Sequence, residues 1–224
     1  MAAQGASQEG LKRAAGTHAA GYVAAGMRVG LGTGSTVRYT IEAIAAAGLD
    51  VECVATSVET RDLATGLGLR VVAPDAIGAV DVAIDGADEV DPALNLTKGG
   101  GGALTREKVV AQMAARFIVV ADASKLVEVL GAFGTPLEVL DFAPGAVEAR
   151  VRDLGALAVT VRTGRSDNGN LLMDADFGAT IDDPPALGAS LAAIAGIVEH
   201  GLFDGAMVER VVVAGVGGVH ELTK

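Results

Sequence analysis

Residues 27–48 decide the fold class, and they read MRVGLGTGSTVRYTIEAIAAAG. Met27–Leu31 is a short apolar run typical of a buried strand, and a turn containing two glycines follows at residues 32–36. Apolar residues then recur at helical spacing, at Val37, Ile41 and Ile44. Strand, glycine-rich turn and helix in this order present backbone amides and the positive end of a helix dipole to an anion.

The turn at residues 32–36, GTGST, favours a single phosphate over a nucleotide as its ligand. It lacks the G-x-G-x-x-G spacing of a dinucleotide site and the Gly-Lys-Ser/Thr of a P-loop. One phosphate held by Ser35, Thr36 and the loop amides is the simpler fit. The alternative is a tight turn with a purely structural role.

Strands and helices alternate along the first part of the chain. Strands are expected at residues 27–31, 51–55, 69–73 and 80–84, and a short helix is expected at 58–67. This alternation predicts a parallel sheet, and ligands gather at the carboxyl ends of such strands. The expected fold of this part is therefore Rossmann-like.

The last of these strands runs directly into Asp85-Gly86-Ala87-Asp88-Glu89. Asp85 and Asp88 would therefore lie at the carboxyl edge of the sheet, where a ligand is expected. Two other interpretations stay open, namely a solvated acidic turn and a metal site. The spacing matches no calcium-binding loop and no histidine is near, which argues against the metal.

Residues 98–108, KGGGGALTREK, combine a cation, an amide-lined loop and a carboxylate. Glycines let backbone N–H groups approach a ligand closely, because no Cβ atom stands in the way. We expect Thr105 to be the N-cap of a helix that carries Glu107 in its first turn. The apolar stripe of that helix would run through Val109, Val110, Met113 and Phe117.

Proton abstraction next to a carbonyl group needs such a set, which is a base together with hydrogen-bond donors for the enolate oxygen. A non-functional origin must be weighed against this interpretation. Glycine accounts for 31 of the 224 residues, so a run of four can arise by chance. Glutamate is also common in a first helical turn, because the helix dipole favours an anion there.

The composition argues against several classes of protein. Half of the residues are hydrophobic, which allows a sizeable core, but no apolar run reaches the ~18 residues needed to span a bilayer. The net charge is −11 and there is no basic stretch, which argues against a nucleic-acid partner. Cys53 is the only cysteine, so an internal disulfide and a cysteine metal cluster are excluded. The N-terminus lacks a signal-peptide pattern, and a cytoplasmic location is expected.

The pattern changes from about residue 131. Strands are expected at residues 136–140, 157–162, 171–176 and 196–203, and helices at 144–154 and 184–194. The order βαββαβ is that of the ferredoxin-like split unit, and Asn168-Gly169 favours a primed hairpin turn between its middle strands. We therefore expect a Rossmann-like parallel-sheet domain at residues 1–130 and 207–224, with an inserted smaller ferredoxin-like α+β domain at 131–206.

Four motifs follow one another along the chain, at Gly32–Thr36, Asp85–Glu89, Lys98–Lys108 and Ala121–Lys125. On these motifs and their spacing, the sequence resembles type A ribose-5-phosphate isomerases over nearly its whole length. The resemblance implies an aldose–ketose isomerase that needs no cofactor and no metal. It also implies a small sugar phosphate as ligand, ribose 5-phosphate or ribulose 5-phosphate, and a homo-oligomer, either dimer or tetramer.

The resemblance implies a role for each matched residue. Glu107 resembles the catalytic base, which moves a proton between C2 and C1 through an enediolate. Asp85 resembles the residue that assists opening of the furanose ring, with Asp88 beside it. Lys98 and the amides of Gly99–Gly101 resemble the donors that stabilise the developing oxyanion. The implied substrate contacts are Thr33, Gly34, Ser35, Thr36, Asp85, Gly86, Ala87, Asp88, Lys98, Gly99, Gly100, Gly101 and Lys125.

Two other functions remain to be distinguished. An amino-sugar-phosphate isomerase or deaminase would be expected to use a histidine near its acidic residues, whereas His18, His200 and His220 all lie outside the motifs. A non-catalytic sugar-phosphate sensor would usually carry a DNA-binding segment, and only six residues precede the first expected helix at Ser7. Turnover of ribose 5-phosphate separates the three possibilities.

Overall fold

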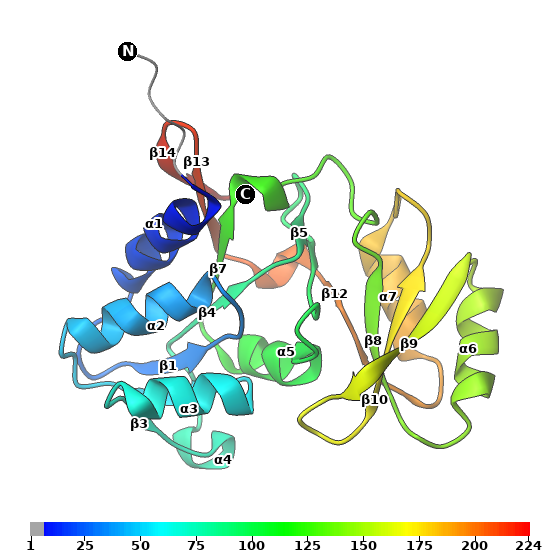
Figure 1. Cartoon of the computed structure of the whole chain (residues 1–224), viewed down its shortest axis with the longest axis horizontal. Coiled ribbons are helices and arrows are strands. Elements are labelled where there is room, and N and C mark those ends of the chain that lie inside the picture. The colour runs from blue at the N-terminus through cyan, green and yellow to red at the C-terminus, as the bar shows by residue number, and fades with distance from the viewer. Residues whose placement is uncertain (1–6) are drawn as a thin grey trace. The chain divides into compact units, whose positions relative to one another are not determined.

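The computed structural model describes residues 7–224, which form two compact units (Figure 1). The first unit comprises Met1–Gly86, so far as it is described, together with Val109–Lys125 and Val208–Lys224. The second unit comprises Ala87–Lys108 and Leu126–Met207. The chain therefore leaves the first unit twice and returns to it twice.

A seven-stranded sheet forms the first unit, in the order β14-β13-β7-β4-β1-β2-β3. Its strands are β1 Arg28–Leu31, β2 Glu52–Ala55, β3 Arg70–Val71, β4 Val82–Gly86, β7 Phe117–Asp122, β13 Arg210–Gly215 and β14 Gly218–Leu222. All neighbours pair in parallel except β14, which is antiparallel to β13. The predicted Rossmann-like sheet is confirmed. Successive strands are added on opposite sides of the β1–β4 pair, so this pair marks the topological switch point.

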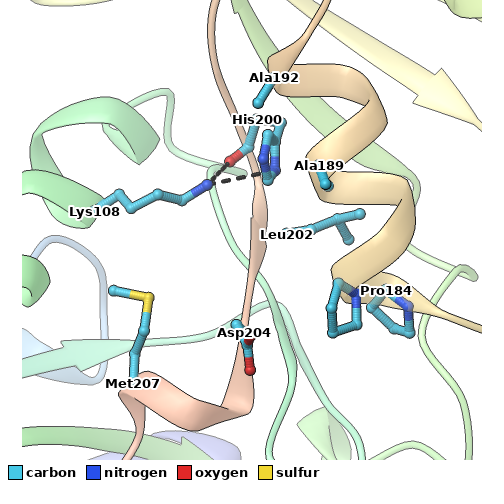
Figure 2. Close-up of a pocket in the computed structure, with 10 residues that line it drawn as sticks. Lys108, Pro184, Ala189, Ala192, His200, Leu202, Asp204 and Met207 are labelled. Atoms are coloured by element: carbon cyan, nitrogen blue, oxygen red, sulfur yellow. Dashed lines mark hydrogen bonds between the residues drawn. The ribbon is translucent and has the colours of Figure 1, made fainter.

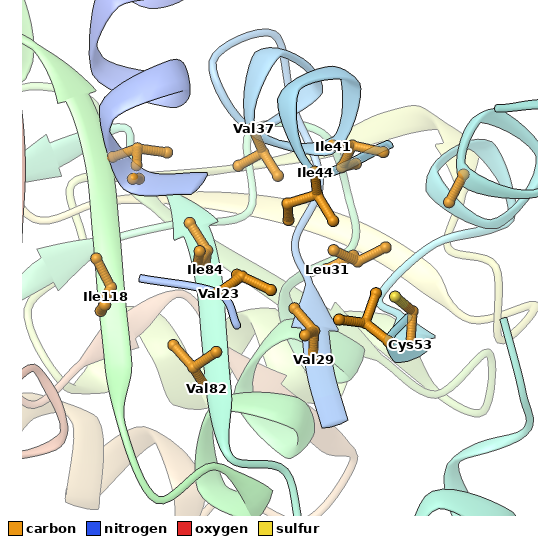
Figure 3. Close-up of a cluster of buried hydrophobic side chains, with 14 of the residues drawn as sticks. Val23, Val29, Leu31, Val37, Ile41, Ile44, Cys53, Val82, Ile84 and Ile118 are labelled. Atoms are coloured by element: carbon orange, nitrogen blue, oxygen red, sulfur yellow. The ribbon is translucent and has the colours of Figure 1, made fainter. Parts of the chain in front are cut away.

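The helices of the first unit are α1 Gln8–Ala20, α2 Val37–Ala46, α3 Val58–Gly66 and the short α4 Pro74–Ile77. A fifth helix, α5 Leu104–Met113, contributes its last five residues to this unit. The core gathers Leu31 of β1, Ile84 of β4, and Ile41 and Ile44 of α2, and each of these side chains is at most 1% exposed (Figure 3). The helical spacing of Ile41 and Ile44 thus places both side chains in the core, as expected.

The second unit contains a four-stranded antiparallel sheet in the order β11-β8-β10-β9. Its elements are β8 Thr135–Val139, α6 Pro144–Asp153, β9 Ala158–Arg165, β10 Leu171–Asp176, α7 Pro184–Ala192 and β11 Ile197–His200. The sheet packs on both helices through a core that includes Leu137, Val151, Met173 and Leu191. The fourth strand therefore lies beside the first, as in the ferredoxin-like arrangement that the sequence predicts.

Three two-residue strands form a further sheet in the second unit, and the sequence analysis did not predict this sheet. They are β5 Glu89–Val90, β6 Leu96–Thr97 and β12 Leu202–Phe203, in the order β12-β6-β5. This pairing explains why Ala87–Lys108 groups with the second unit, whereas the predicted boundary placed these residues in the first domain. The expected strand 196–203 is also divided, because Ile197–His200 pairs with β8 whereas Leu202–Phe203 pairs with β6. Gly201 stands between the two parts, where a Cβ atom would lie 2.2 Å from the carbonyl oxygen of Lys98.

Several local predictions are wrong. Helix α5 begins at Leu104, so Thr105 lies inside its first turn and is not its N-cap. Val109 is 47% exposed, and Phe117 belongs to β7 instead of the helix. The hairpin between β9 and β10 is not a primed turn, since Gly169 has a φ of +84° but Asn168 has no positive φ. No helix of residues 7–224 is both long and apolar enough to cross a bilayer.

Candidate functional site

The carboxyl end of β4 lies against the glycine-rich turn that follows β1, at the switch point of the sheet. Asp85 is 2% exposed, and its Oδ1 accepts hydrogen bonds from the backbone N–H groups of Thr33 at 3.1 Å and Gly86 at 2.7 Å. A Cβ atom at Gly32 would lie 2.1 Å from the same oxygen. Only glycine therefore allows Asp85 to occupy this position, which links two motifs that the sequence analysis treated separately.

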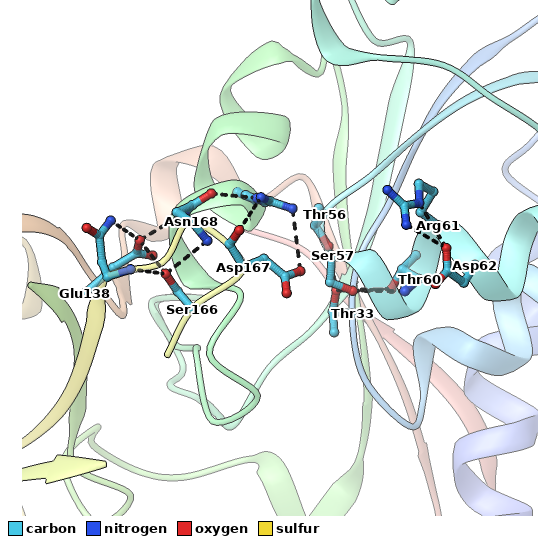
Figure 4. Close-up of polar contacts among 12 residues, drawn as sticks. Thr33, Thr56, Ser57, Thr60, Arg61, Asp62, Glu138, Ser166, Asp167 and Asn168 are labelled. Atoms are coloured by element: carbon cyan, nitrogen blue, oxygen red, sulfur yellow. Dashed lines mark hydrogen bonds and ion pairs between the residues drawn. The ribbon is translucent and has the colours of Figure 1, made fainter. Parts of the chain in front are cut away.

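The side chain of Thr33 is engaged within its own unit (Figure 4). Its Oγ1 lies 2.7 Å from the hydroxyl of Thr56, 2.8 Å from that of Ser57 and 3.1 Å from that of Thr60. This hydroxyl cluster ties the turn after β1 to the segment after β2. The turn is therefore fixed by short polar side chains of its own sheet.

Ser35 and Thr36 differ from Thr33 in their surroundings. Ser35 is exposed and Thr36 is half-buried. Thr36 occupies the N-cap position of α2 without making a side-chain capping bond. The ten-residue helix α2 thus directs its N-terminus at the turn, and the dipole there favours an anion. This arrangement suits the phosphate contact expected of Ser35 and Thr36.

Lys125 follows the carboxyl end of β7, which pairs in parallel with β4. The turn between strand and lysine is shaped by Asp122, whose Oδ1 accepts hydrogen bonds from the backbone N–H and the hydroxyl of Ser124. Within the first unit, the ends of β1, β4 and β7 therefore carry Thr33–Thr36, Asp85 and Lys125 to one edge of the sheet. The residues thus lie at the carboxyl edge, where the sequence predicts a ligand.

The four-glycine loop belongs to the second unit, with Ala87, Asp88 and Glu107. Gly99 and Gly102 have φ values of +105° and +80°, and the N–H of Gly102 donates to the carbonyl of Gly99 at 2.9 Å. The N–H of Gly100 donates to Oδ2 of Asp88 at 2.8 Å. The glycines at 99 and 102 are therefore required by the backbone conformation. One of the three amides expected to face a substrate is bound by Asp88 instead.

A buried ion pair joins the two ends of the Lys98–Lys108 motif. The Nζ of Lys98 lies 3.3 Å from Oε2 of Glu107, and these side chains are 2% and 5% exposed. The ammonium group also lies 5.5 Å from the ring centroid of Phe203, a cation–π distance. In such a low-dielectric environment the charge of Lys98 acts strongly on any negative charge formed beside it. The structure thus brings together the expected base and the expected cation.

Lys108 and His200 form a second buried cluster, which the sequence analysis did not identify (Figure 2). The Nζ of Lys108 donates to Glu199 and to the carbonyl oxygen of His200, each at 2.7 Å. Burial lowers the pKa of Lys108. Burial, followed by the charge of Lys108, lowers the pKa of His200 to about 4, so the imidazole is neutral at pH 7. Lys108 therefore fastens helix α5 to strand β11, at the edge of a cavity of about 210 Å³.

Glu138 holds the start of helix α5 to the ferredoxin-like sheet. This residue of β8 is fully buried, and its carboxylate accepts hydrogen bonds from Thr105, Asn170, Asn168 and Ser166 (Figure 4). Burial would raise the pKa of Glu138, but the four hydrogen bonds together lower it below its ordinary value. Thr105 stands two residues before Glu107, so this ionised carboxylate fixes the turn that carries the expected base. No short sequence pattern signals such a contact.

Among the residues that the structure describes, no group of three histidine, cysteine or acidic side chains is arranged to hold a metal ion. The parallel sheet, the glycine-rich turn at its switch point and the buried carboxylate beside a lysine are features typical of an α/β enzyme. The Asp85–Asp88 segment spans the boundary of the two units, because Asp85 and Gly86 belong to the first and Ala87 and Asp88 to the second.

Comparison with known proteins names the family. The family model described as "Ribose 5-phosphate isomerase A (phosphoriboisomerase A)" matches residues 52–218. A protein of that name from Streptococcus thermophilus is 46% identical over 218 residues, which cover 93% of this chain and 96% of that protein. A second, from Desulfatibacillum aliphaticivorans, is 44% identical over 96% of this chain and 98% of its own length.

Solved structures agree with this assignment. The crystal structure of ribose 5-phosphate isomerase A from Neisseria gonorrhoeae has a TM-score of 0.94 and 32% identity, covering 98% of this chain and 99% of that one. A D-ribose-5-phosphate isomerase in complex with phospho-erythronic acid has a TM-score of 0.93 and 36% identity, covering 98% of this chain and 100% of that one. The chain belongs to the ribose 5-phosphate isomerase A family.

Proposed function

We propose that this chain interconverts D-ribose 5-phosphate and D-ribulose 5-phosphate through an enediolate, with Glu107 as the general base. The reaction class, an aldose–ketose isomerisation in the non-oxidative branch of the pentose phosphate pathway, is that of the family. The observation that carries the residue assignment is the buried pair of Lys98 and Glu107, 3.3 Å apart, beside the four-glycine loop.

The chemistry follows from the charges that this pair supplies. Glu107 accepts the proton of C2 of the open-chain aldose and returns it to C1, while the proton of the C2 hydroxyl passes to the C1 oxygen, so that the carbonyl group moves from C1 to C2. As the C–H bond breaks, negative charge develops on the carbonyl oxygen, and a fixed ammonium group and backbone N–H groups lower the energy of that charge. Lys98 is buried and held by its carboxylate and aromatic neighbours, so little reorganisation is needed when the charge forms.

The remaining roles concern binding and ring opening. We assign the phosphate to Ser35, Thr36 and the N-terminus of α2, with Lys125 as a further cation. Asp85 accepts two backbone hydrogen bonds and is nearly fully buried, which suits a carboxylate that must stay in place while it exchanges a proton with the sugar ring. Asp88 holds the glycine loop through the N–H of Gly100, a positioning role that adds to its expected place beside the substrate.

An isomerase assay with ribose 5-phosphate tests the proposal directly. Formation of ribulose 5-phosphate by the purified chain is expected, and the rate should persist after exhaustive treatment with EDTA. Turnover of an amino-sugar phosphate with release of ammonia would instead support the deaminase alternative. Binding of a sugar phosphate without turnover would support the sensor.

Two further properties stay predictions. We propose that the enzyme is a homo-oligomer, either dimer or tetramer, and that it acts in the cytoplasm. Light scattering at micromolar concentration tests the first, since a fully active monomer would contradict it. Fractionation of the source cells tests the second.

A further inference from the structure

The guanidinium group of Arg162 has a fixed position in the second unit. Arg162 lies on β9, and its Nε and Nη2 donate to the two carboxylate oxygens of Asp174 on the neighbouring strand β10. The side chain of Arg162 is 19% exposed. A planar guanidinium bound at two points to a carboxylate has little freedom to rotate. The contact with Asp174 therefore fixes the direction in which the remaining nitrogen of Arg162, Nη1, points.

Nη1 of Arg162 binds the four-glycine loop. It donates to the carbonyl oxygen of Gly99 at 2.8 Å and to that of Gly100 at 3.1 Å. Two consecutive carbonyl groups thus converge on one cation. Because a peptide group is planar and trans, the N–H of the following residue points away from each carbonyl. The amides of Gly100 and Gly101 therefore face away from Arg162.

The two amides differ in what they meet. The N–H of Gly100 donates to Asp88 at 2.8 Å, so the peptide between Gly99 and Gly100 is held at both ends. The peptide between Gly100 and Gly101 is held at its carbonyl end by Arg162. Gly101 is exposed, and none of the hydrogen bonds recorded among residues 7–224 uses its N–H. Of the two amides that Arg162 directs, that of Gly101 is therefore the one left to meet a ligand.

Such a loop needs an external anchor. Four consecutive glycines restrict their own backbone less than any other residues, so a peptide plane among them can turn unless other groups hold it. Oxyanion stabilisation depends on donors that are already oriented when the charge forms. A side chain that fixes a carbonyl in this loop consequently fixes the direction of the next amide.

We propose that Arg162 is a positioning residue, which orients the Gly100–Gly101 peptide so that the N–H of Gly101 donates to the oxygen of the enediolate. The inference rests on the proposed isomerase function. Under this proposal Arg162 and Asp174, which lie in the ferredoxin-like sheet, contribute to catalysis by orienting the glycine loop. The proposal also removes Gly100 from the three amides expected to serve the oxyanion, because Asp88 accepts its N–H.

Two substitutions of Arg162 and a matched control test the proposal. Arg162→Met keeps the length of the side chain but removes every donor, and Arg162→Lys keeps one cation that can reach a single carbonyl. Arg165→Met is the control, because Arg165 also lies on β9, pairs with Asp141 and donates to a glycine carbonyl, that of Gly169. Each variant is compared with the wild type by kcat and KM for ribose 5-phosphate.

We expect Arg162→Met to weaken stabilisation of the transition state while leaving substrate binding nearly unchanged. We expect kcat of Arg162→Met to fall about 10- to 100-fold with KM within about threefold, since loss of one oxyanion donor costs about 10²–10³ in rate and a turned peptide is an incomplete loss. Arg162→Lys should lose less, and Arg165→Met should match the wild type. Inhibition by phospho-erythronic acid, the compound bound to the solved relative, should weaken in Arg162→Met in parallel with kcat/KM.

Hydrogen exchange supplies a readout that does not depend on turnover. Amides in a peptide covering residues 98–103 should exchange faster in Arg162→Met than in the wild type or in Arg165→Met. If the methionine variant does not fold, the lysine variant decides the same comparison.

Three results would overturn the role of Arg162. They are an unchanged kcat in a folded variant with wild-type exchange in the loop, a rise of KM alone, and an equal loss in Arg165→Met. An inactive wild type would instead overturn the proposed function, and the exchange measurement would still test whether Arg162 orders the loop.

Discussion

The loop after β1 and the four-glycine loop are both rich in glycine, but they are held in place by different means. The turn at Thr33 is fixed by hydroxyl groups and by backbone N–H bonds to Asp85, all at the ends of adjacent strands. The loop at Gly99–Gly102 is fixed by ionised side chains, with Asp88 on one peptide and Arg162 on two carbonyls. Hydroxyl groups and one carboxylate thus hold the turn that we propose binds the phosphate, whereas an acidic and a basic side chain hold the loop that we propose stabilises the enediolate.

The largest effect on activity is expected at Glu107, which lies in the same motif as the four-glycine loop. Glu107→Gln keeps the size of the side chain but removes the base, so kcat should fall by about 10²–10⁴, while folding and substrate affinity survive. In deuterated water the wild type should place solvent deuterium at the carbon that receives the proton, unless transfer outpaces exchange, and the variant should lose this labelling together with isomerisation. More than about a tenth of wild-type kcat in a folded variant would mean that the base lies elsewhere, with Asp85 the next candidate.

Lys98 should show almost as large an effect, with a signature in stability as well. Lys98→Met removes the cation that faces Glu107 at 3.3 Å, and we expect kcat to fall by about 10²–10³. The variant should also lose about 3–5 kcal/mol of unfolding free energy, because the buried carboxylate of Glu107 then loses the cation that lies 3.3 Å from it.

The double variant Lys98→Met/Glu107→Gln separates these two effects. Denaturant unfolding should show that stability is largely restored, while the isomerase assay should show no recovery of activity. If the double variant is no more stable than Lys98→Met, the two side chains are not energetically coupled.

Substitutions in the turn after β1 should affect substrate binding more than the chemical step. Replacing both Ser35 and Thr36 by alanine should raise KM by about tenfold or more and lower kcat much less, because phosphate contacts are made equally in ground and transition states. Thr33→Val is the matched comparison, since the Thr33 hydroxyl is engaged with Thr56, Ser57 and Thr60 and its loss should act first on stability. If the alanine variant instead shows a large loss of kcat with an unchanged KM, Ser35 and Thr36 act in the chemical step and not in phosphate binding.

The smallest effect is expected at Glu138, and it depends on pH. Glu138→Gln should cost about 1.5–3 kcal/mol at pH 7, because several hydrogen bonds to a buried charged group are weakened. The pKa of Glu138 is lowered in the folded protein, so its stabilising contribution is present above the unfolded pKa of about 4.3 and is lost as the pH falls through the folded value. Denaturant unfolding at pH 7 and at about pH 3 should therefore show a difference between the proteins that shrinks in acid. A difference independent of pH would mean that Glu138 contributes through its shape alone.

Features with strong local signals were predictable from the sequence. The strand, turn and helix predicted at residues 27–48 are present as β1, the turn after it and α2. They were predictable because the spacing of apolar residues, which sets the buried face of each element, is visible in the local sequence. The βαββαβ order of the second half likewise follows from elements long enough to show their period. The motifs at Asp85 and at Lys98–Lys108 were visible as residue types suited to acid–base chemistry.

Other features were decided only when the chain folded. A strand of two residues such as β5 has no period to read, so the sheet that joins residues 87–108 to the second unit was missed. The assignment of Thr105 as an N-cap was wrong, since Thr105 lies inside α5 and its hydroxyl donates to a buried carboxylate on β8.

The sequence by itself therefore determined the layers of this protein and the residue types of its site. The tertiary structure decided which charges hold the site in place, because Arg162 reaches the glycine loop across 63 residues of chain and Glu138 reaches the Glu107 helix across 33, while Asp174 fixes Arg162. Such pairings depend on the register of strands and on burial, which raises the strength of each charge–dipole contact. Neither the register of the strands nor the burial of a side chain can be predicted from a short stretch of sequence.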